Sequence, residues 1–270
     1  MDAATPLVSV IMSVYNSEQW LKLAIDSIIH QSYPNWELII IDDASNESAR
    51  QILQSYASDQ RIIIHRRDRQ QGLIKNLNLA IDLSKGDFIA RMDADDISEP
   101  DRLAKQVTYL QQHPTVDAIA SFITMINEKG DITGIWADDR KTSGYESIKT
   151  ILPRTNCIAH PTVMLRTQVL RQYRYNEHQV HMEDWDLWLR LLNDGKSIEK
   201  INEPLLLYRV HSSSVTSTYL KRSAFQKKYV FYKQFLSQNK EGAIVSRIRL
   251  ISRLNRVKLF LSRIKRKFTS

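Results

Sequence analysis

The segment LVSVIMSVYNSEQWLKLAIDSIIH, residues 7–30, carries the pattern that decides the fold. Its first part, residues 7–15, is almost continuously apolar, as in a strand that is buried on both faces of a sheet. In residues 17–30 the apolar side chains instead recur every three or four positions, which is the spacing of one helix face. A buried strand followed directly by an amphipathic helix predicts a βα unit and a largely parallel sheet.

The same alternation continues along the chain. Further strands are predicted at 37–42, 61–65 and 87–93, with helices at 47–57 and 73–84. After residue 115 the pattern is mixed, with strands predicted at 116–126 and 158–166, a helix at 183–195 and an extended segment at 204–211. We expect an α/β fold in which a mostly parallel sheet is flanked by helices, and a single domain over residues 1–220.

Charge is unevenly distributed along the 270 residues. The overall composition, 43% apolar and 25% charged, is ordinary for a globular protein. Residues 221–270 contain 15 Lys and Arg and one acid, Glu241, whereas residues 1–220 contain 23 basic and 29 acidic residues. An acidic body with a basic tail predicts a site in the body and attraction of the tail to an anionic partner.

The chain shows no targeting pattern. No basic flank precedes the first apolar run, and no stretch reaches the roughly 18 apolar residues of a membrane span. The single cysteine, Cys157, has no partner for an internal disulfide or a cysteine-based zinc site. These features predict a cytoplasmic protein.

Three aspartates lie close together in the segment RMDADDISEPDRL, residues 91–103. Asp93, Asp95 and Asp96 directly follow a predicted strand, and Ser98 with Asp101 has the spacing of a helix N-cap. Capping accounts for Ser98 and Asp101 and leaves the three aspartates unexplained. They form either a solvated loop or a cation site, and the residues alone leave both interpretations open.

The glycines bear on this choice. None of the seven forms a G-x-G-x-x-G or G-x-x-x-x-G-K arrangement, so the familiar backbone cradles for phosphate are absent from the sequence. A nucleotide bound at the strand ends would need another positive partner for its phosphates. Clustered carboxylates hold Mg2+ or Mn2+, and either ion would supply that charge.

Six segments of the chain, taken in order, resemble one known family. They are VSVIMSVYN, ELIIIDDASNES, GLIKNLNLAIDLSKGDFIARMDADD, HPTVMLR, EDWDLWLRL and PLLLYRVHSSSVT, spread over residues 7–217. In this order they resemble the inverting nucleotide-sugar glycosyltransferases of family 2, which have the GT-A fold. The resemblance implies a nucleotide-sugar half at about 1–115 and an acceptor half at about 116–220.

The resemblance also implies roles for residues on the nucleotide side. Ser13 and Tyr15 match positions that line the base, and Asp43 matches the acid that accepts from uracil N3–H. Asp42 is expected to orient the same turn. Relatives often have Ala-Arg-Asn where this chain has residues 74–76, so Lys75 is expected to supply a point charge in place of the arginine. Relatives often have Asp-Gly-Ser where this chain has residues 43–45, so that turn lacks a glycine.

For the metal, the resemblance identifies residues 93–95 as the D-x-D motif, which implies Mn2+ or Mg2+ as cofactor. Asp93 is then expected to approach the ribose, and Asp95 to coordinate the ion that bridges the diphosphate. Asp96 is assigned as a second ligand or a helper. His211 is expected either to complete the metal shell, since a neutral imidazole suits Mn2+, or to be a loop histidine that bonds to the backbone.

Asp184 in EDWD matches the family's catalytic base. From the residues alone, the helix dipole, which favours acids at a helix start, is the preferred explanation of Asp184. Two other functions stay open: a membrane-bound scaffold that binds a nucleotide sugar without transferring it, and a nucleotidyltransferase. The second would need basic residues near the first strand to hold a triphosphate, and the sequence has none there.

The tail, residues 221–270, has apolar residues every three or four positions with Arg and Lys between them. These residues are Ile244, Ile248, Ile251, Leu254, Val257, Leu261, Ile264 and Phe268. One interpretation is a helix in the plane of an anionic membrane surface, which would place the enzyme peripherally on the cytoplasmic face, near a lipid-linked glycan acceptor. The alternative is a helix that packs on its own domain or on another subunit. Nucleic acid is not expected as a partner, since no recognition motif accompanies the charge.

Overall fold

A computed structural model of the chain describes residues 5–179, 181–212 and 224–254. Among these residues nine strands form one sheet in the order β3-β2-β1-β4-β8-β6-β9-β5, with β7 paired to β6. The strands are β1 (Val8–Val14), β2 (Trp36–Asp42), β3 (Ile62–Arg66), β4 (Phe88–Asp93), β5 (Ile97–Ser98), β6 (Ala118–Ile126), β7 (Ile132–Ile135), β8 (Met164–Arg166) and β9 (Ile198–Arg209).

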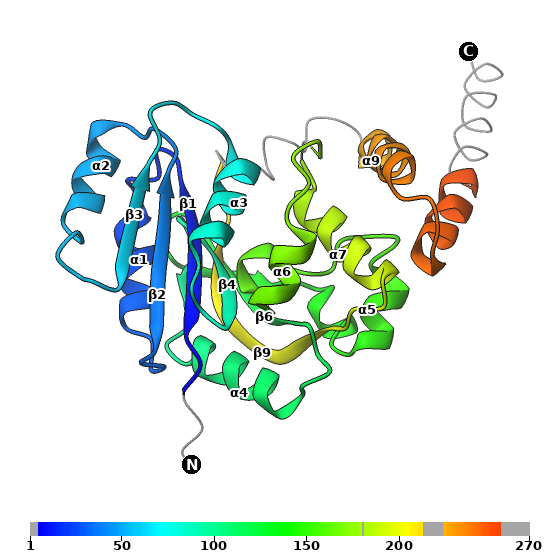
Figure 1. Ribbon diagram of the computed structural model, residues 1–270, viewed down its shortest axis with the longest axis horizontal. Coiled ribbons are helices and arrows are strands. Elements are labelled where there is room, and N and C mark those ends of the chain that lie inside the picture. Colours follow the sequence, from blue (N-terminus) through cyan, green and yellow to red (C-terminus); the bar gives the residue numbers. More distant parts are fainter. Residues whose placement is uncertain (1–4, 180, 213–223, 255–270) are drawn as a thin grey trace.

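Helices flank this sheet (Figure 1). They are α1 (Leu21–Ile29), α2 (Glu47–Gln54), α3 (Leu73–Leu83), α4 (Arg102–Gln112), α5 (Tyr145–Ile151), α6 (Thr167–Tyr173), α7 (Glu183–Asn193) and α9 (Ala224–Gln238), with short 3-10 turns at η1 (Asp139–Lys141) and η2 (His160–Thr162) and a last helix over 243–254. The predicted α/β class, with a mostly parallel sheet between helices, is confirmed. Parallel pairing joins β3, β2, β1 and β4, and also β6 and β9, while antiparallel pairs connect the rest.

The apolar strands are buried on both faces, as their sequences predict. In β2, Leu38 and Ile40 pack into one hydrophobic core with α1, α2 and α4. Ile39 and Ile41 point to the opposite face and pack into a second core with α3, α6 and α7. Successive side chains of a strand point to opposite faces, so a continuous apolar run supplies both cores. The polar residues at the strand ends are thereby left at one edge of the sheet.

The predicted capping role of Ser98 is wrong. Ile97 and Ser98 form β5, which pairs with β9, and α4 begins only at Arg102. The Ser98 hydroxyl accepts a hydrogen bond from Gln31 Nε2 at 3.2 Å. Asp101 occupies the N-cap position without a capping bond from its side chain. Strand pairing with a distant segment therefore overrides the local capping pattern.

The described part of the tail packs against the body of the protein. Ile244, Val245 and Ile248 are buried in the same core as α3, α6 and α7, and Ile251 is partly buried against it. For Ile244 and Ile248 the structure agrees with the alternative in which the helix packs on its own domain, and their side chains are not free to enter a membrane. The predicted apolar positions from 257 onward lie outside the described residues.

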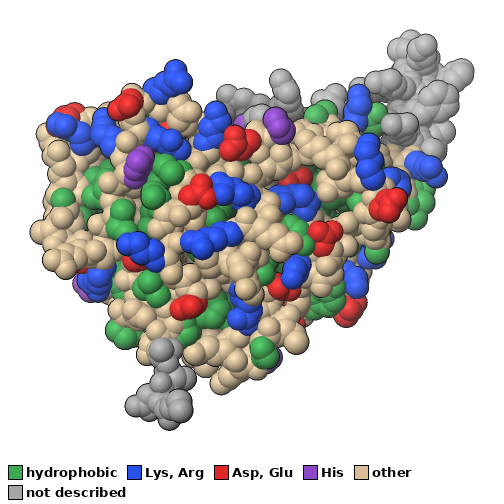
Figure 2. All heavy atoms as spheres, in the orientation of Figure 1, with side chains coloured by type: hydrophobic (Ala, Val, Ile, Leu, Met, Phe, Trp, Pro, Cys, Tyr) green, Lys and Arg blue, Asp and Glu red, His purple; other side chains and the backbone are tan. Residues whose placement is uncertain are grey.

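Helix hydropathy and the distribution of surface charge bear on the expected membrane contact. None of the described helices is both long and apolar enough to cross a bilayer. On the face shown in Figure 2, Lys and Arg side chains are interspersed with acids. The basic side chains coloured on this face therefore form no single patch.

Candidate active site

The three aspartates lie together at the carboxyl end of β4. Asp93 is the last residue of the strand, and its backbone pairs with Ser13 of β1. One carboxylate oxygen from each of Asp93, Asp95 and Asp96 lies within 4.8 Å of the others. Asp96 is buried, while Asp93 and Asp95 are partly exposed. The cluster faces the edge of the sheet at which parallel strands bind ligands.

Neighbouring groups compensate part of this charge. The buried Arg91 forms an ion pair with Asp93. His211 Nε2 lies 2.9 Å from Asp95 Oδ2, and the backbone N–H of Arg209 donates to Asp96 Oδ1 at 2.8 Å. The other oxygen of Asp96, Oδ2, is buried and has no hydrogen-bond partner among the described residues. The cluster therefore still has a buried oxygen that can accept a ligand.

The electrostatics of the cluster fit a divalent cation. Burial raises the pKa of Asp95 and raises that of Asp96 well above its usual value, and the negative charge of Asp93 adds to both effects. A bound cation would stabilise the ionised carboxylates. The oxygen donors suit Mg2+ or Mn2+, and an imidazole from His211 suits Mn2+. The residues present thus fit the expected metal.

Arg209 bonds to the backbone on two sides of the aspartate cluster. Its Nε donates to the backbone oxygen of Asp95 at 2.8 Å, and its Nη1 donates to that of Asn127 at 3.0 Å. The guanidinium also lies over the ring of Trp20, 5.4 Å from the centroid. The same Trp20 ring lies 4.4 Å from that of His211. Arg209 therefore holds the turn after β4 and the position of His211.

The predicted nucleotide-side residues surround the ends of β1 and β2. The Ser13 hydroxyl accepts from Asn76 Nδ2 at 3.1 Å. Asp42 accepts from the backbone N–H of Ser45 at 2.9 Å and from Arg66 at 2.5 Å, so its side chain holds the turn after β2. Tyr15 is 48% exposed, and Lys75 is exposed. Tyr15 and Lys75 are accessible to a ligand, while Asp42 serves the turn.

Asp43 connects two turns. Its two carboxylate oxygens accept from the backbone N–H groups of Gln71 and Gly72, at 2.7 and 2.9 Å. Each oxygen of an ionised carboxylate has a second acceptor site, so these contacts leave room for a ligand N–H. The next residue, Ala44, has φ of 61°, the left-handed conformation that glycine adopts more easily. The residue that replaces the family's glycine is thus held in the conformation that favours glycine.

A second acidic group lies at the start of α7. Asp184 is in the first turn, and its Oδ2 accepts from Asn156 Nδ2 at 2.6 Å. Burial raises the pKa of Asp184, while hydrogen bonds from the Trp185 backbone and from Asn156 act in the opposite direction. Burial and the adjacent charge of Asp184 raise the pKa of Glu183 to about 7. Glu183 can therefore take up and release a proton near neutral pH.

Arg91 connects the two acidic groups. Its positive charge lowers the pKa of Asp95 and Asp96 on one side and of Glu183 and Asp184 on the other. Charge–charge interactions weaken with distance, so Arg91 lies near both groups. The structure therefore brings together the aspartates after β4 and the acids of α7, which are about ninety residues apart in the sequence.

Sequence reasoning missed Arg91 and Asn156. Arg91 is a charged residue inside an apolar strand, two positions before Asp93, and this placement is a signal that could have found it. Asn156 is in an irregular segment, and no pattern in the sequence connects it to Asp184. Its role appears only in the folded chain.

Comparisons with known proteins agree with the geometry. The model of glycosyl transferase family 2 matches residues 9–174. The chain is 37% identical over 218 residues to the O-antigen biosynthesis glycosyltransferase WbnJ of Escherichia coli, which covers 79% of this chain and 84% of WbnJ.

Two solved structures have the same fold. TarS 1–349 of S. aureus in complex with UDP-GlcNAc matches with a TM-score of 0.70 at 18% identity, over 89% of this chain and 71% of that one. The mannosyltransferase PcManGT from Pyrobaculum calidifontis, in complex with GDP-Man and Mn2+, matches with a TM-score of 0.63 at 17% identity, over 90% and 68%. These likenesses confirm the GT-A type fold. From the family match and the WbnJ alignment, the chain belongs to glycosyl transferase family 2.

Proposed function

We propose that the protein is a metal-dependent inverting glycosyltransferase that moves a sugar from a UDP-sugar to a hydroxyl of a glycan acceptor. The observation that carries the proposal is the pair of acidic groups on either side of Arg91. Inverting transfer needs a base for the acceptor hydroxyl and compensation for the charge of the leaving diphosphate. The acids of α7 match the first need, and the aspartates after β4 match the second.

Asp184 is the proposed base. Its carboxylate accepts the proton of the acceptor hydroxyl while the hydroxyl oxygen forms a bond to the anomeric carbon. The bond from that carbon to the diphosphate oxygen breaks on the opposite face, and its electron pair leaves with the diphosphate. One displacement without a covalent intermediate inverts the configuration. Hydrogen bonds from Asn156 and the Trp185 backbone favour the ionised form of the half-buried Asp184 and oppose the effect of burial on its pKa.

Asp95, Asp96 and His211 are the proposed metal ligands, and Asp93 the proposed ribose contact. When bound, Mn2+ or Mg2+ acts as a Lewis acid that stabilises the growing charge of the diphosphate. The Mn2+ in the PcManGT complex supports this assignment. The buried, unpartnered Oδ2 of Asp96 supports it from within this chain.

The proposed donor contacts are Ser13, Tyr15, Asp43 and Lys75, with Asp42 holding the turn between them. A uracil nucleotide is supported by the TarS complex, which contains UDP-GlcNAc. A cell-surface polysaccharide as acceptor is supported by WbnJ, which acts in O-antigen biosynthesis. Attachment to an anionic membrane near a lipid-linked acceptor is proposed only for residues 255–270, whose structure is not described.

A thermal-shift panel of nucleoside diphosphates and nucleotide sugars, with and without Mn2+, tests the donor. A ligand that binds the folded state raises its apparent stability, so UDP with Mn2+ should give the largest shift. A shift from GDP alone, or none from any nucleotide, would contradict a UDP-sugar donor. Product NMR then reads the anomeric configuration. Binding of UDP and Mn2+ without turnover of any donor and acceptor would instead favour the inert scaffold.

A further inference from the structure

The carboxylate of Asp184 is held by a segment that precedes it by about thirty residues. Asn156 donates to Asp184 Oδ2 at 2.6 Å. The adjacent Trp185 donates from its indole N–H to the backbone oxygen of Leu152 at 2.7 Å. Residues 152–156 therefore contact the start of α7 at two points, one on the proposed base and one on its neighbour.

Helix α9 holds the same segment from the outside. The Tyr232 hydroxyl donates to the backbone oxygen of Pro153 at 2.8 Å, and Lys228 Nζ donates to that of Arg154 at 2.9 Å. The ring of Phe231 stacks on Trp185, with centroids 4.6 Å apart and planes 9° from parallel. Phe231 and Tyr232 are both buried. One face of α9 thus contacts both the 152–156 segment and the start of α7.

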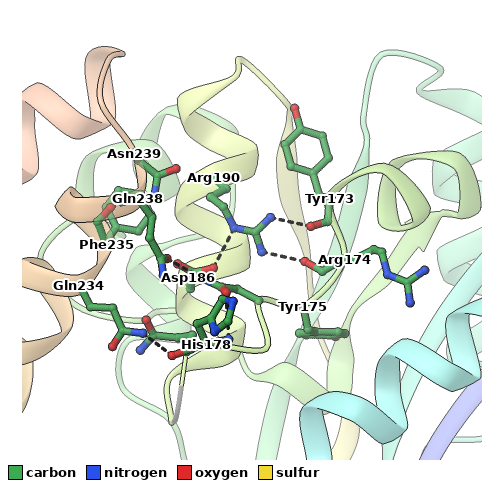
Figure 3. A network of polar contacts seen from close by, with 12 residues as sticks. Tyr173, Arg174, Tyr175, His178, Asp186, Arg190, Gln234, Phe235, Gln238 and Asn239 are labelled. Carbon is green, nitrogen blue, oxygen red and sulfur yellow. Dashed lines mark hydrogen bonds and ion pairs between the residues drawn. The ribbon is translucent and has the colours of Figure 1, made fainter.

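Helix α9 also holds the segment that leads into α7 (Figure 3). Asn176 Nδ2 donates to Gln238 Oε1 at 2.6 Å, and Gln234 Nε2 donates to the backbone oxygen of His178. This segment ends at Met182, which has φ of 58° immediately before the helix. A non-glycine residue in this conformation persists only where surrounding contacts hold it. The contacts from α9 lie four to six residues before Met182, at Asn176 and His178.

Arg190 fixes the other end of this segment from within α7. Its guanidinium donates to the backbone oxygens of Tyr173 and Arg174, each at 2.7 Å, and pairs with Asp186 at 2.8 Å (Figure 3). The segment between α6 and α7 is thus held by α7 at its start and by α9 farther along. Contacts from Arg190 and from α9 therefore both restrain the segment that leads to the start of α7, where the proposed base lies.

We propose that Asn156 is a positioning residue for sugar transfer. We further propose that α9 supports the contact between Asn156 and Asp184 by packing against both segments that carry them. We call residues 152–156 and α9 together the base clamp. The proposal rests on the assignment of Asp184 as base. The Asn156 amide fixes the orientation of the carboxylate that is to receive the proton of the acceptor hydroxyl. Transfer rates depend strongly on such alignment, since displacements of about 1 Å cost about a hundredfold.

Several charged or titratable groups face Asp184 from the elements around it. Glu183 belongs to the same helix, Arg91 comes from β4, Tyr175 follows α6, and Lys228 of α9 lies 5.9 Å from the ring centroid of Trp185. Asn156 is neutral, so replacing it with alanine leaves these charges unchanged. The substitution removes a hydrogen bond to the ionised carboxylate, which raises the pKa of Asp184. The acid limb of the rate profile should therefore move to higher pH.

A double-mutant cycle of Asn156→Ala and Asp184→Asn tests the positioning role. Hydrogen bonds to charged groups correspond to roughly a 10- to 100-fold effect, so N156A should lower kcat by at least about 10-fold with little change in KM for the donor. In the D184N background N156A should cause no further loss. An equal loss in both backgrounds, or an unchanged kcat in N156A alone, would overturn the proposal. Near-normal turnover by D184N would instead overturn the assignment of the base.

A second comparison tests the support from α9. Phe231→Ala removes the ring stacked on Trp185, whereas the matched control Ile248→Ala removes a buried side chain from the helix over 243–254. Both variants should lower Tm. Per folded enzyme, only F231A should lower kcat, by about 10-fold, and Phe231→Tyr should restore it. If F231A does not fold, Phe231→Leu replaces it as the variant that lacks the stacked ring. If F231A and I248A had the same kcat per folded enzyme, a positioning role for α9 would be contradicted.

Discussion

The aspartates after β4 and the acids of α7 are held in different ways. The first group is attached to strand ends, and its main contacts come from β4 itself and from the end of β9. Asp184 depends on the 152–156 segment, the segment between α6 and α7, and α9, which span about eighty residues. A site formed by strand ends is visible as a motif. A site formed by packing of distant segments is not.

Arg91 joins the two groups, so its removal should have the largest effect on stability. Arg91→Met leaves Asp93 and its neighbours without their buried counter-charge, and breaking a buried pair in this way costs about 3–5 kcal/mol. Chemical denaturation measures the loss. Arg61→Met, at an exposed arginine that pairs with Asp59, should cost about 1 kcal/mol or less. Similar losses at the two sites would show that Arg91 is not the link between the groups.

Packing of the tail should have the next largest effect. Ile248 is fully buried, and Ile248→Ala should cost about 2–5 kcal/mol. Leu250 in the same helix is 59% exposed, and Leu250→Ala should change stability by about 0.5 kcal/mol or less. Equilibrium unfolding of both variants checks the pair. If Leu250→Ala were as costly as Ile248→Ala, the helix would pack in another orientation.

The raised pKa of Glu183 predicts a dependence of stability on pH. The folded state holds this proton up to about pH 7, whereas the unfolded chain releases it near 4.5. The folded state therefore binds more protons between these values, and stability from this group falls as pH rises through that range. Glu183→Gln removes the buried charge, so its Tm relative to wild type should be higher at about pH 8 than at about pH 5. A constant difference would mean that Glu183 titrates normally.

The turn after β2 should show the smallest effect. Ala44 has φ of 61°, and Ala44→Gly should stabilise the protein by about 1 kcal/mol because glycine adopts this conformation without strain. The control Ala104→Gly, within α4, should instead destabilise by about 1 kcal/mol. Thermal unfolding gives both signs. A loss of stability in A44G would show that this turn is not strained.

Much of the fold could be predicted from the sequence because its first half consists of repeated strand and helix patterns. The strands at 37–42 and 87–93 and the helix at 183–195 are within two residues of those in the structure. Ser98 was assigned wrongly because a local capping pattern competes with strand pairing to a segment a hundred residues away. The burial of Ile244 and Ile248 could not be predicted, since an amphipathic pattern specifies an apolar face without specifying its partner.

The candidate site divides in the same way. The D-x-D residues, Asp43 and Asp184 are proposed as site residues from the resemblance, and in the structure Arg91 pairs with Asp93 and lies near the acids of α7. The contact of Asn156 with Asp184 is different, because it joins two segments that are about thirty residues apart in the sequence. No motif within either segment contains that information.

The central claim is that the aspartates after β4 bind the donor and its metal, while Asp184 serves the transfer step. Calorimetric titration of UDP, with and without Mn2+, into the Asp95→Asn and Asp184→Asn variants tests it most directly. The account predicts that D95N loses the gain in UDP affinity that Mn2+ provides, and that D184N binds UDP with Mn2+ as wild type does while transfer falls by about a hundredfold or more. Metal-dependent UDP binding that survives in D95N, or is lost in D184N, would contradict it.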